Sequence, residues 1–196
     1  IGSDGGAIGE KDVVTTPDVA QGEDASAVDA QVDAEADVCG DGRCDAGECE
    51  TCPEDCSLCP GVLVITEIMK DPDAVMDSQG EWFELVNVSD AVIDLAGVTL
   101  RDEGSDVHVI DPDEALLVEP GAYVVLAVVA ELGDGLTADH VVSGFYLDND
   151  ADEVVLEANG VVIDAVAYGP DFPDPEGASM QLHVDEVADA TANDDG

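Results

Sequence analysis

All six cysteines of the chain fall between residues 39 and 59, in the stretch CGDGRCDAGECETCPEDCSLC. This stretch is short and almost without large apolar side chains, so it cannot build a core of its own and needs covalent cross-links. An even number of clustered cysteines is typical of a disulfide framework, although the sequence does not decide how they pair. We predict a small disulfide module at residues 39–60. Its cysteines are Cys39, Cys44, Cys49, Cys52, Cys56 and Cys59.

Zinc binding and redox catalysis are two other uses that clustered cysteines can have. Cys49 and Cys52 form one CxxC pair, and Cys56 and Cys59 form a second, as in zinc knuckles. Zinc knuckles usually have a longer insert between the pairs, and three residues leave little room for a tetrahedral site. We therefore favour disulfides, which place the protein in an oxidising compartment.

Acidic residues are spread through the same stretch. Disulfides would hold their backbones close together, and hard carboxylate oxygens are the ligands that Ca²⁺ takes. The module is therefore a candidate calcium site as well as a cross-linked one. The competing interpretation is that these residues only reflect the acidity of the whole chain. The candidate ligands are Asp41, Asp45, Glu48 and Asp55.

The charge of the chain excludes several classes of partner. It has 48 acidic residues against four basic ones, for a net charge of −44. Nucleic-acid binding requires Lys and Arg to replace condensed counterions, so DNA and RNA are not expected partners. Anionic membrane surfaces are disfavoured for the same reason. Cations, neutral polysaccharides and other proteins, in particular other surface proteins, remain.

The N-terminal part, residues 1–38, has no aromatic side chain and a large excess of acidic over basic residues. Small and like-charged side chains cannot bury enough area to offset chain entropy, so we predict a disordered acidic tether. The sequence begins at Ile1 without Met or a signal peptide, as in a trimmed chain, and a lipid anchor upstream is consistent with that. No apolar run is long enough for a transmembrane helix.

From residue 61 onward, short runs rich in Val, Ile, Leu and Tyr alternate with Gly, Pro, Asp and Asn. This pattern predicts an all-β antiparallel sandwich over residues 61–196. Asn159-Gly160 between two apolar runs predicts a tight hairpin. Residues 124–132 could form a helix, but their β-branched content favours a strand. The expected strands are 62–68, 82–88, 92–95, 98–101, 107–110, 116–118, 122–128, 153–157, 161–168 and 178–184.

Seven segments occur in an order that resembles the lamin-tail domain: 64–69, 80–87, 93–100, 120–125, 152–156, 162–169 and 177–180. The resemblance implies an immunoglobulin-like β-sandwich of the kind that bacteria carry in secreted and surface proteins, sometimes beside nuclease or other enzyme domains. Nuclear lamin tails have a basic surface, so a DNA-binding role does not transfer to this acidic chain. Family members usually continue beyond a stretch like residues 192–196, so we expect the sandwich to be truncated at the C-terminus.

The cysteine stretch also resembles short repeats of secreted bacterial proteins with the form CGDGxCxxGE…CxxCPxDC. The matching positions include the glycines and acids after Cys39 and the run from Cys52 to Cys56. One departure is that Glu48 directly precedes Cys49, where the pattern has a residue between them.

We expect no catalytic site in this chain. The GxSxG, P-loop, GxGxxG and HExxH motifs are all missing. Glu81 and Glu84 flank aromatic residues and could form a carboxylate pair, but we interpret them as strand carboxylates at the solvent face. The stretch 148–159 opens like an EF-hand, yet it lacks the glycine and the final glutamate of that loop. His108, His140 and His183 are isolated in the sequence.

The sequence thus predicts a non-enzymatic module outside the cell or at the cell surface, which serves adhesion, scaffolding or positioning and is stabilised by calcium. No cofactor other than Ca²⁺ is expected. The alternative is an accessory domain of a secreted enzyme, such as a nuclease or another hydrolase, whose catalytic part lies outside this chain.

Overall fold

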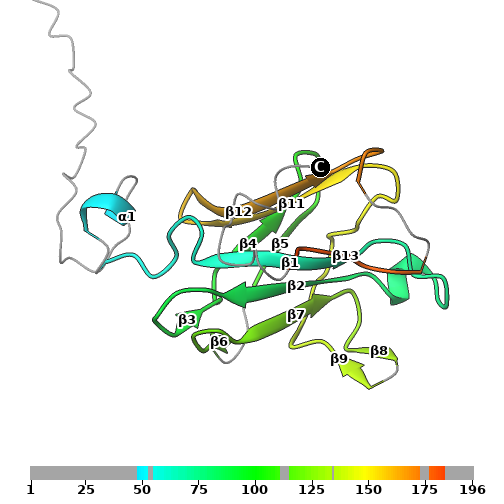
Figure 1. Ribbon diagram of the computed structural model, residues 1–196, viewed down its shortest axis with the longest axis horizontal. Helices are drawn as coiled ribbons and strands as arrows, with labels where there is room; N and C mark the ends of the chain where they lie inside the picture. Colours follow the sequence, from blue (N-terminus) through cyan, green and yellow to red (C-terminus); the bar gives the residue numbers. More distant parts are fainter. Residues whose placement is uncertain (1–47, 53–54, 111–114, 134, 173–176, 184–196) are drawn as a thin grey trace, which may run out of the picture. The chain divides into compact units, whose positions relative to one another are not determined.

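The computed structural model describes residues 48–52, 55–110, 115–133, 135–172 and 177–183. These residues form almost only β-strands, as Figure 1 shows. The predicted tether at residues 1–38 and the first two cysteines lie outside the described residues. The elements are α1 (Glu48–Thr51), β1 (Leu63–Met69), η1 (Asp77–Gln79), β2 (Trp82–Asn87), β3 (Ile93–Asp94), β4 (Thr99–Arg101), β5 (Val107–Val109), β6 (Leu117–Val118), β7 (Tyr123–Ala127), β8 (Glu131–Gly133), β9 (Leu136–Thr137), β10 (His140–Val141), β11 (Asp152–Ala158), β12 (Val161–Tyr168) and β13 (Met180–Gln181).

Two main sheets make up the sandwich. The first has the strand order β10-β7-β2-β1-β13, and the second has the order β12-β11-β4-β5. The short pairs β3-β6 and β8-β9 stand apart from both. The predicted antiparallel pairing is confirmed except between β10 and β7, which run parallel. The β8-β9 hairpin lies between these two strands in the sequence. It lets the chain turn back toward the side where β7 begins, so that β10 can run in the same direction as β7.

The core lies between the two sheets. Alternate residues of each strand point inward, because side chains of a strand alternate between its two faces. Phe83, Leu85, Leu100 and Leu156 are at most 1% exposed. Trp82 and Val125 lie half-buried on the outer face of the first sheet. They occupy the strand positions next to inward-pointing residues, so alternation turns them outward.

The predicted hairpin at Asn159-Gly160 is confirmed. Both residues have positive φ, 52° and 78°, as a two-residue turn with the twist of the flanking strands requires. Ala158 and Val161 face each other directly across it. Residues 124–132 contain β7 and the start of β8 rather than a helix.

Candidate functional site

The described cysteines are cross-linked. Cys49 and Cys59 form a disulfide with a Cα–Cα distance of 5.5 Å, and Cys52 and Cys56 are disulfide-bonded as well. The sulfur atoms of Cys49, Cys56 and Cys59 lie within 4.8 Å of one another. Sulfur in a disulfide is not a thiolate and therefore not a zinc ligand, which argues against the zinc alternative.

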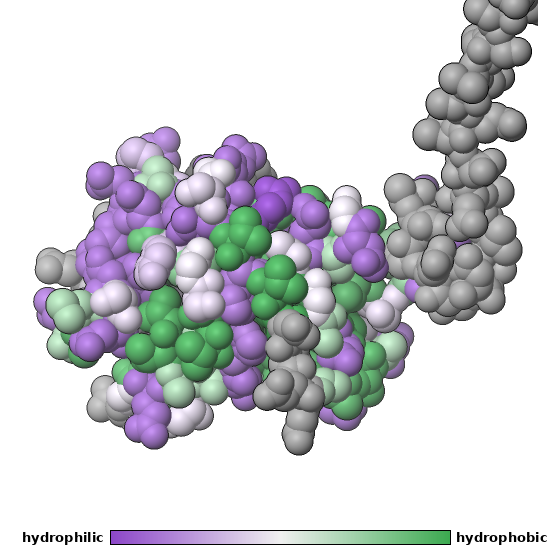
Figure 2. Space-filling model, turned by 180° about the vertical axis from the view of Figure 1, so that it is seen from behind, coloured by the Kyte–Doolittle hydropathy of each residue, from purple (hydrophilic) through white to green (hydrophobic). Residues whose placement is uncertain are grey.

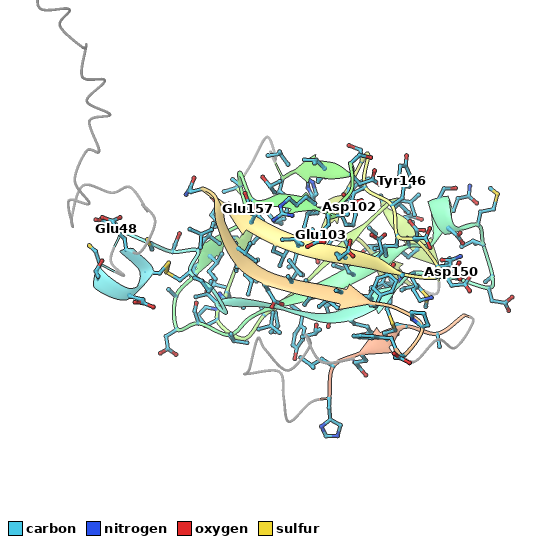
Figure 3. The ribbon with its side chains drawn as sticks, turned by 90° about the horizontal axis from the view of Figure 1, so that it is seen from above. Glu48, Asp102, Glu103, Tyr146, Asp150 and Glu157 are labelled. Atoms are coloured by element: carbon cyan, nitrogen blue, oxygen red, sulfur yellow. A yellow bond between two sulfur atoms is a disulfide. The ribbon has the colours of Figure 1, made fainter. Side chains whose placement is uncertain are left out.

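The calcium prediction stays untested by this geometry. Glu48 is buried on α1, where Figure 3 labels it, and Asp55 is half-buried. Asp41 and Asp45 lie outside the described residues. The four predicted ligands therefore remain a sequence-based set.

A buried carboxylate joins the two sheets at one lateral edge of the sandwich. Asp164 on β12 is 5% exposed, and its Oδ2 accepts a hydrogen bond of 2.7 Å from the backbone N–H of Ile65 on β1. The register of β1 against β2 shifts just after Ile65, so this residue lies where the ladder is irregular. Gly61 adds a second link, because its N–H donates to the carbonyl of Ile163 at 2.7 Å.

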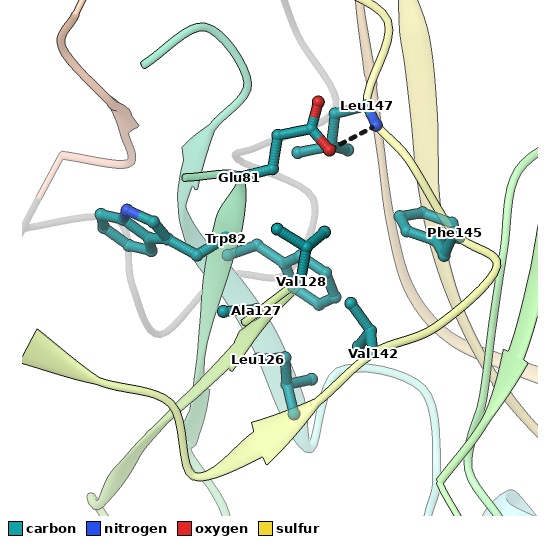
Figure 4. Close-up of a pocket in the computed structure, with 9 residues that line it drawn as sticks. Glu81, Trp82, Leu126, Ala127, Val128, Val142, Phe145 and Leu147 are labelled. Carbon is teal, nitrogen blue, oxygen red and sulfur yellow. Dashed lines mark hydrogen bonds between the residues drawn. The ribbon is translucent and has the colours of Figure 1, made fainter. Parts of the chain in front are cut away.

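Glu81 was interpreted as a carboxylate at the solvent face, and this interpretation is wrong. Glu81 is 2% exposed, because it lies two residues before the inward-pointing Phe83 and alternation turns both side chains to the same face. Its Oε2 accepts the N–H of Leu147 at 3.3 Å (Figure 4). Burial, with smaller contributions from Asp77 and Asp152, raises the pKa of Glu81 to about 7, although the Leu147 N–H opposes this rise.

A pKa near neutrality is what a general acid or base requires, but the space beside Glu81 argues for a structural role. Apolar side chains such as Phe145 and Val142 line it, and it is packed too tightly to admit a water molecule. Glu84, the second residue of the predicted pair, points to the outer face and accepts a hydrogen bond of 2.8 Å from the hydroxyl of Thr66. The two carboxylates therefore do not converge on one point.

The segment between β10 and β11 is tied down by three ionisable side chains. Besides the Glu81 contact with Leu147, His108 accepts the N–H of Ser143 at 3.3 Å, and Asp106 accepts the N–H of Tyr146 at 3.1 Å. Between these contacts Phe145 enters the core and meets Phe83 edge to face, with ring centroids 6.1 Å apart. This segment lies at the edge of the sandwich where β10 is the outermost strand of the first sheet and β5 is the outermost strand of the second.

His108 and His140 meet at the same edge, although 32 residues separate them in the sequence. Their Nε2 atoms are 2.8 Å apart. Because Nδ1 of His108 accepts the Ser143 N–H, neutral His108 carries its proton on Nε2 and donates it to His140. Burial lowers both pKa values, and for His140 the proximity of His108 lowers the pKa further.

The EF-hand-like stretch begins as a polar loop, residues 148–151, and continues into β11. The Asp148 carboxylate accepts the backbone N–H of Asp150 at 2.8 Å. The Asp152 carboxylate in turn accepts the backbone N–H of Asp148, also at 2.8 Å. The carbonyl of Asp148 also accepts the Tyr168 hydroxyl at 2.7 Å. Lys70 is 5% exposed, donates to the carbonyl of Asn149, and lies over the Tyr168 ring. These contacts fix the loop to the sandwich.

Asn87, Val88 and Ser89 form the glycosylation sequon Asn-X-Ser. The Asn87 side chain is fully buried, and Nδ2 donates to the carbonyls of Ala91 and Val118 at 2.8 Å each. Its Oδ1 accepts the N–H and the hydroxyl of Ser89. A side chain used in this way is not accessible for glycan attachment in the folded protein.

A solvent-open groove lies around Trp82, whose side chain points to the opposite side of β2 from Glu81 (Figure 4). The groove has a volume of about 310 Å³. Its lining combines the indole with the apolar side chains of Met69, Val75 and Leu132 and with the carboxylate-bearing Asp73. The sequence offered one signal for it, since a Trp next to an inward-pointing Phe on a strand must face outward.

The surface around these features is acidic. Figure 3 labels carboxylates that are spread over the molecule, among them Glu157, Asp102 and Asp150. Figure 2 shows one face on which hydrophobic residues form separate patches among hydrophilic ones. Of the two basic residues in the described part of the chain, Lys70 is buried and Arg101 forms an ion pair of 2.9 Å with Glu157.

The fold defines the class of the protein: two packed, mostly antiparallel sheets of short strands form an immunoglobulin-like β-sandwich. The family model of the Lamin Tail Domain matches residues 59–170. This match covers more than half of the chain, and the chain therefore belongs to the lamin tail domain family.

Among the curated proteins, none matches the chain. The helices that the structure describes are all too short to cross a membrane.

Proposed function

We propose that this lamin tail domain is a non-enzymatic binding module that works outside the cell or at its surface, where it positions or scaffolds a partner. The observation that carries the proposal is the groove around Trp82, which is open to solvent and lined by both apolar and acidic groups. The most strongly perturbed carboxyl, Glu81, is by contrast enclosed and used within the fold.

The cross-linked cysteines support the extracellular part of the proposal. Disulfides persist in oxidising environments and are rare where thiols are kept reduced. The acidic surface keeps such a module soluble and away from nucleic acids and anionic lipids. A lipid anchor upstream of residue 1 would hold it at a bacterial surface.

The proposal is tested by antibody labelling of intact cells that express the natural protein. We expect labelling of the sandwich without permeabilisation, together with cysteines that do not react with a thiol reagent until a reductant is added. Labelling that requires permeabilisation, with thiols that react at once, would refute the extracellular role.

Calcium stabilisation is a separate part of the proposal and rests on the predicted ligands in the cysteine module. It is tested by melting the disulfide-intact chain in Ca²⁺ and in EDTA at equal ionic strength. A saturable rise in the midpoint with Ca²⁺ would support a site, because a ligand that binds only the native state stabilises it. Equal midpoints would leave the acids as surface charge.

A further inference from the structure

We propose that the groove around Trp82 binds the side chain of an arginine or lysine from a basic segment of a partner protein. This inference rests on the proposed binding role and names the chemistry of the partner. It is carried by three properties of the groove: its lining, its charge and its rigid frame.

The lining matches a long cationic side chain. Lys and Arg combine an aliphatic stem with a charged head, and the stem packs on apolar surface while the head stays near water or a partner. Met69, Val75 and Leu132 supply apolar surface, and Val75 is 42% exposed before any partner binds. Trp82 supplies the ring whose face attracts a cation most strongly among aromatic side chains.

The charge of the groove favours a cation over a neutral or anionic ligand. Asp73 is part of the lining, and Asp71 and Asp77 lie on the same segment between β1 and β2. The net charge of −44 draws cations toward the whole surface.

The frame of the groove is formed before any partner arrives. Gly80 packs closely against the segment between β1 and β2. A Cβ atom at this position would lie 2.5 Å from the Val75 side chain and 2.7 Å from the Pro72 side chain, so the segment can pack this closely only against glycine. Gly177 has φ of 73°, and its N–H donates to the carbonyl of Asp71 at 2.9 Å. A preformed site loses less conformational entropy when its ligand binds.

A neutral polysaccharide is the other ligand that a tryptophan and a carboxylate could hold, and it is tested beside the peptide. The probes are acetyl-GRGRGRG-amide, the same peptide with citrulline in place of arginine, and cellotetraose. Citrulline keeps the shape of arginine and removes its charge. Trp82 is the only tryptophan of the chain, so its fluorescence reports directly on the groove.

We expect the arginine peptide to change the Trp82 fluorescence saturably with a stoichiometry of one, and the citrulline peptide to bind at least about five-fold more weakly. By calorimetry, Asp73→Asn and Trp82→Leu should each weaken the arginine peptide about five-fold. The matched control is Asp90→Asn, which removes one carboxylate from the turn at the other end of β2 and should leave the affinity unchanged. Unaltered melting midpoints verify that the variants fold.

Three outcomes would overturn the inference. Equal binding of the arginine and citrulline peptides would show that charge is not recognised. Equal effects of Asp73→Asn and Asp90→Asn would assign binding to the general acidity of the surface. Saturable binding of cellotetraose without the arginine peptide would make the groove a glycan site. These measurements use purified protein, so they can fail while surface labelling succeeds, and the reverse also holds.

Discussion

The two lateral edges of the sandwich are closed by different chemistry. At the β1–β12 edge, the buried Asp164 carboxylate binds a backbone N–H of the opposite sheet. At the β5–β10 edge, half-exposed His108 and His140 bind each other, and three ionisable side chains hold the segment that follows β10. The comparison teaches that the first edge is held by one buried hydrogen bond between the sheets, whereas the strength of the second depends on the protonation of side chains whose pKa values are shifted.

The largest effect is expected at the β1–β12 edge. Asp164→Ala should lower the free energy of unfolding by about 3 kcal/mol, because it removes a buried hydrogen bond between the sheets and leaves a gap there. Urea unfolding at pH 7 measures the loss. Asp164→Asn keeps an acceptor and should lose less, and Asp171→Ala, at an exposed site after β12, should be nearly neutral. Equal losses for Asp164→Ala and Asp171→Ala would contradict the link.

The second effect concerns Glu81 at the protonation-dependent edge. Its folded pKa is raised from 4.5 to about 7, so its contribution to stability is present below pH 4.5 and is lost as the pH rises through 7. Glu81→Gln mimics the protonated form and should stabilise the protein at pH 8 by at most about 3 kcal/mol, given about 1.4 kcal/mol per pKa unit over the rise from 4.5 to about 7. Melting curves of both proteins from pH 4 to 8 should diverge with rising pH. A difference in melting midpoint between the two proteins that stays constant from pH 4 to 8 would show that the pKa of Glu81 is not raised by folding.

The histidine pair should show the opposite sign. Both folded pKa values are lowered, so its contribution is present above pH 6.5 and is lost as the pH falls through the folded pKa values. No carboxylate in the described residues is among the causes of either shift; the contacts that act are the histidines themselves and Ser143.

His140→Gln should therefore reduce the loss of stability between pH 6.5 and 5, because the residue with the lowered pKa is removed. The measurement is made in the Glu81→Gln background, because Glu81 changes stability in the opposite direction over an overlapping range. Parallel pH profiles with and without His140 would mean that the pair does not titrate on unfolding.

The smallest effect is expected on the outer face of the second sheet, which serves as a baseline for both edges. Arg101 on β4 and Glu157 on β11 are diagonal neighbours, and their side chains are 34% and 28% exposed. Exposed ion pairs contribute about 0.2–1 kcal/mol, so Arg101→Gln should cost no more than this. A double-mutant cycle with Glu157→Gln at low and high salt measures the pair. A coupling energy between Arg101 and Glu157 as large as the stability loss of Asp164→Ala would mean that this ion pair stabilises the sandwich as strongly as the buried link at its edge.

Strand positions were predictable where alternation and turn residues agreed. The segment Val161–Tyr168 was predicted with its correct ends, because Asn159-Gly160 fixes its start. The strands β8, β9 and β10 were missed, since two or three residues are too few to show a period of two. The 3₁₀ turn at Asp77–Gln79 was missed for a similar reason.

The site features were harder to predict, because they depend on contacts between distant parts of the chain. The pairing of His108 with His140 requires the two sheets to end at the same edge, and no local pattern contains this information. The burial of Glu81 could have been inferred from its parity with Phe83, but the strand was expected to begin only at Trp82. The link from Asp164 to Ile65 joins residues 99 positions apart.

The pairing of β13 with β1 has a consequence for how the chain folds during synthesis. Ser179 and Glu67 are in contact across a separation of 112 residues, so this side of β1 cannot be covered until nearly the whole described chain has been made. Contacts of such long range slow folding, and an unpaired strand edge can recruit other nascent chains. Glu67, which projects from that strand, places a charge beside the waiting edge and discourages such pairing until β13 arrives.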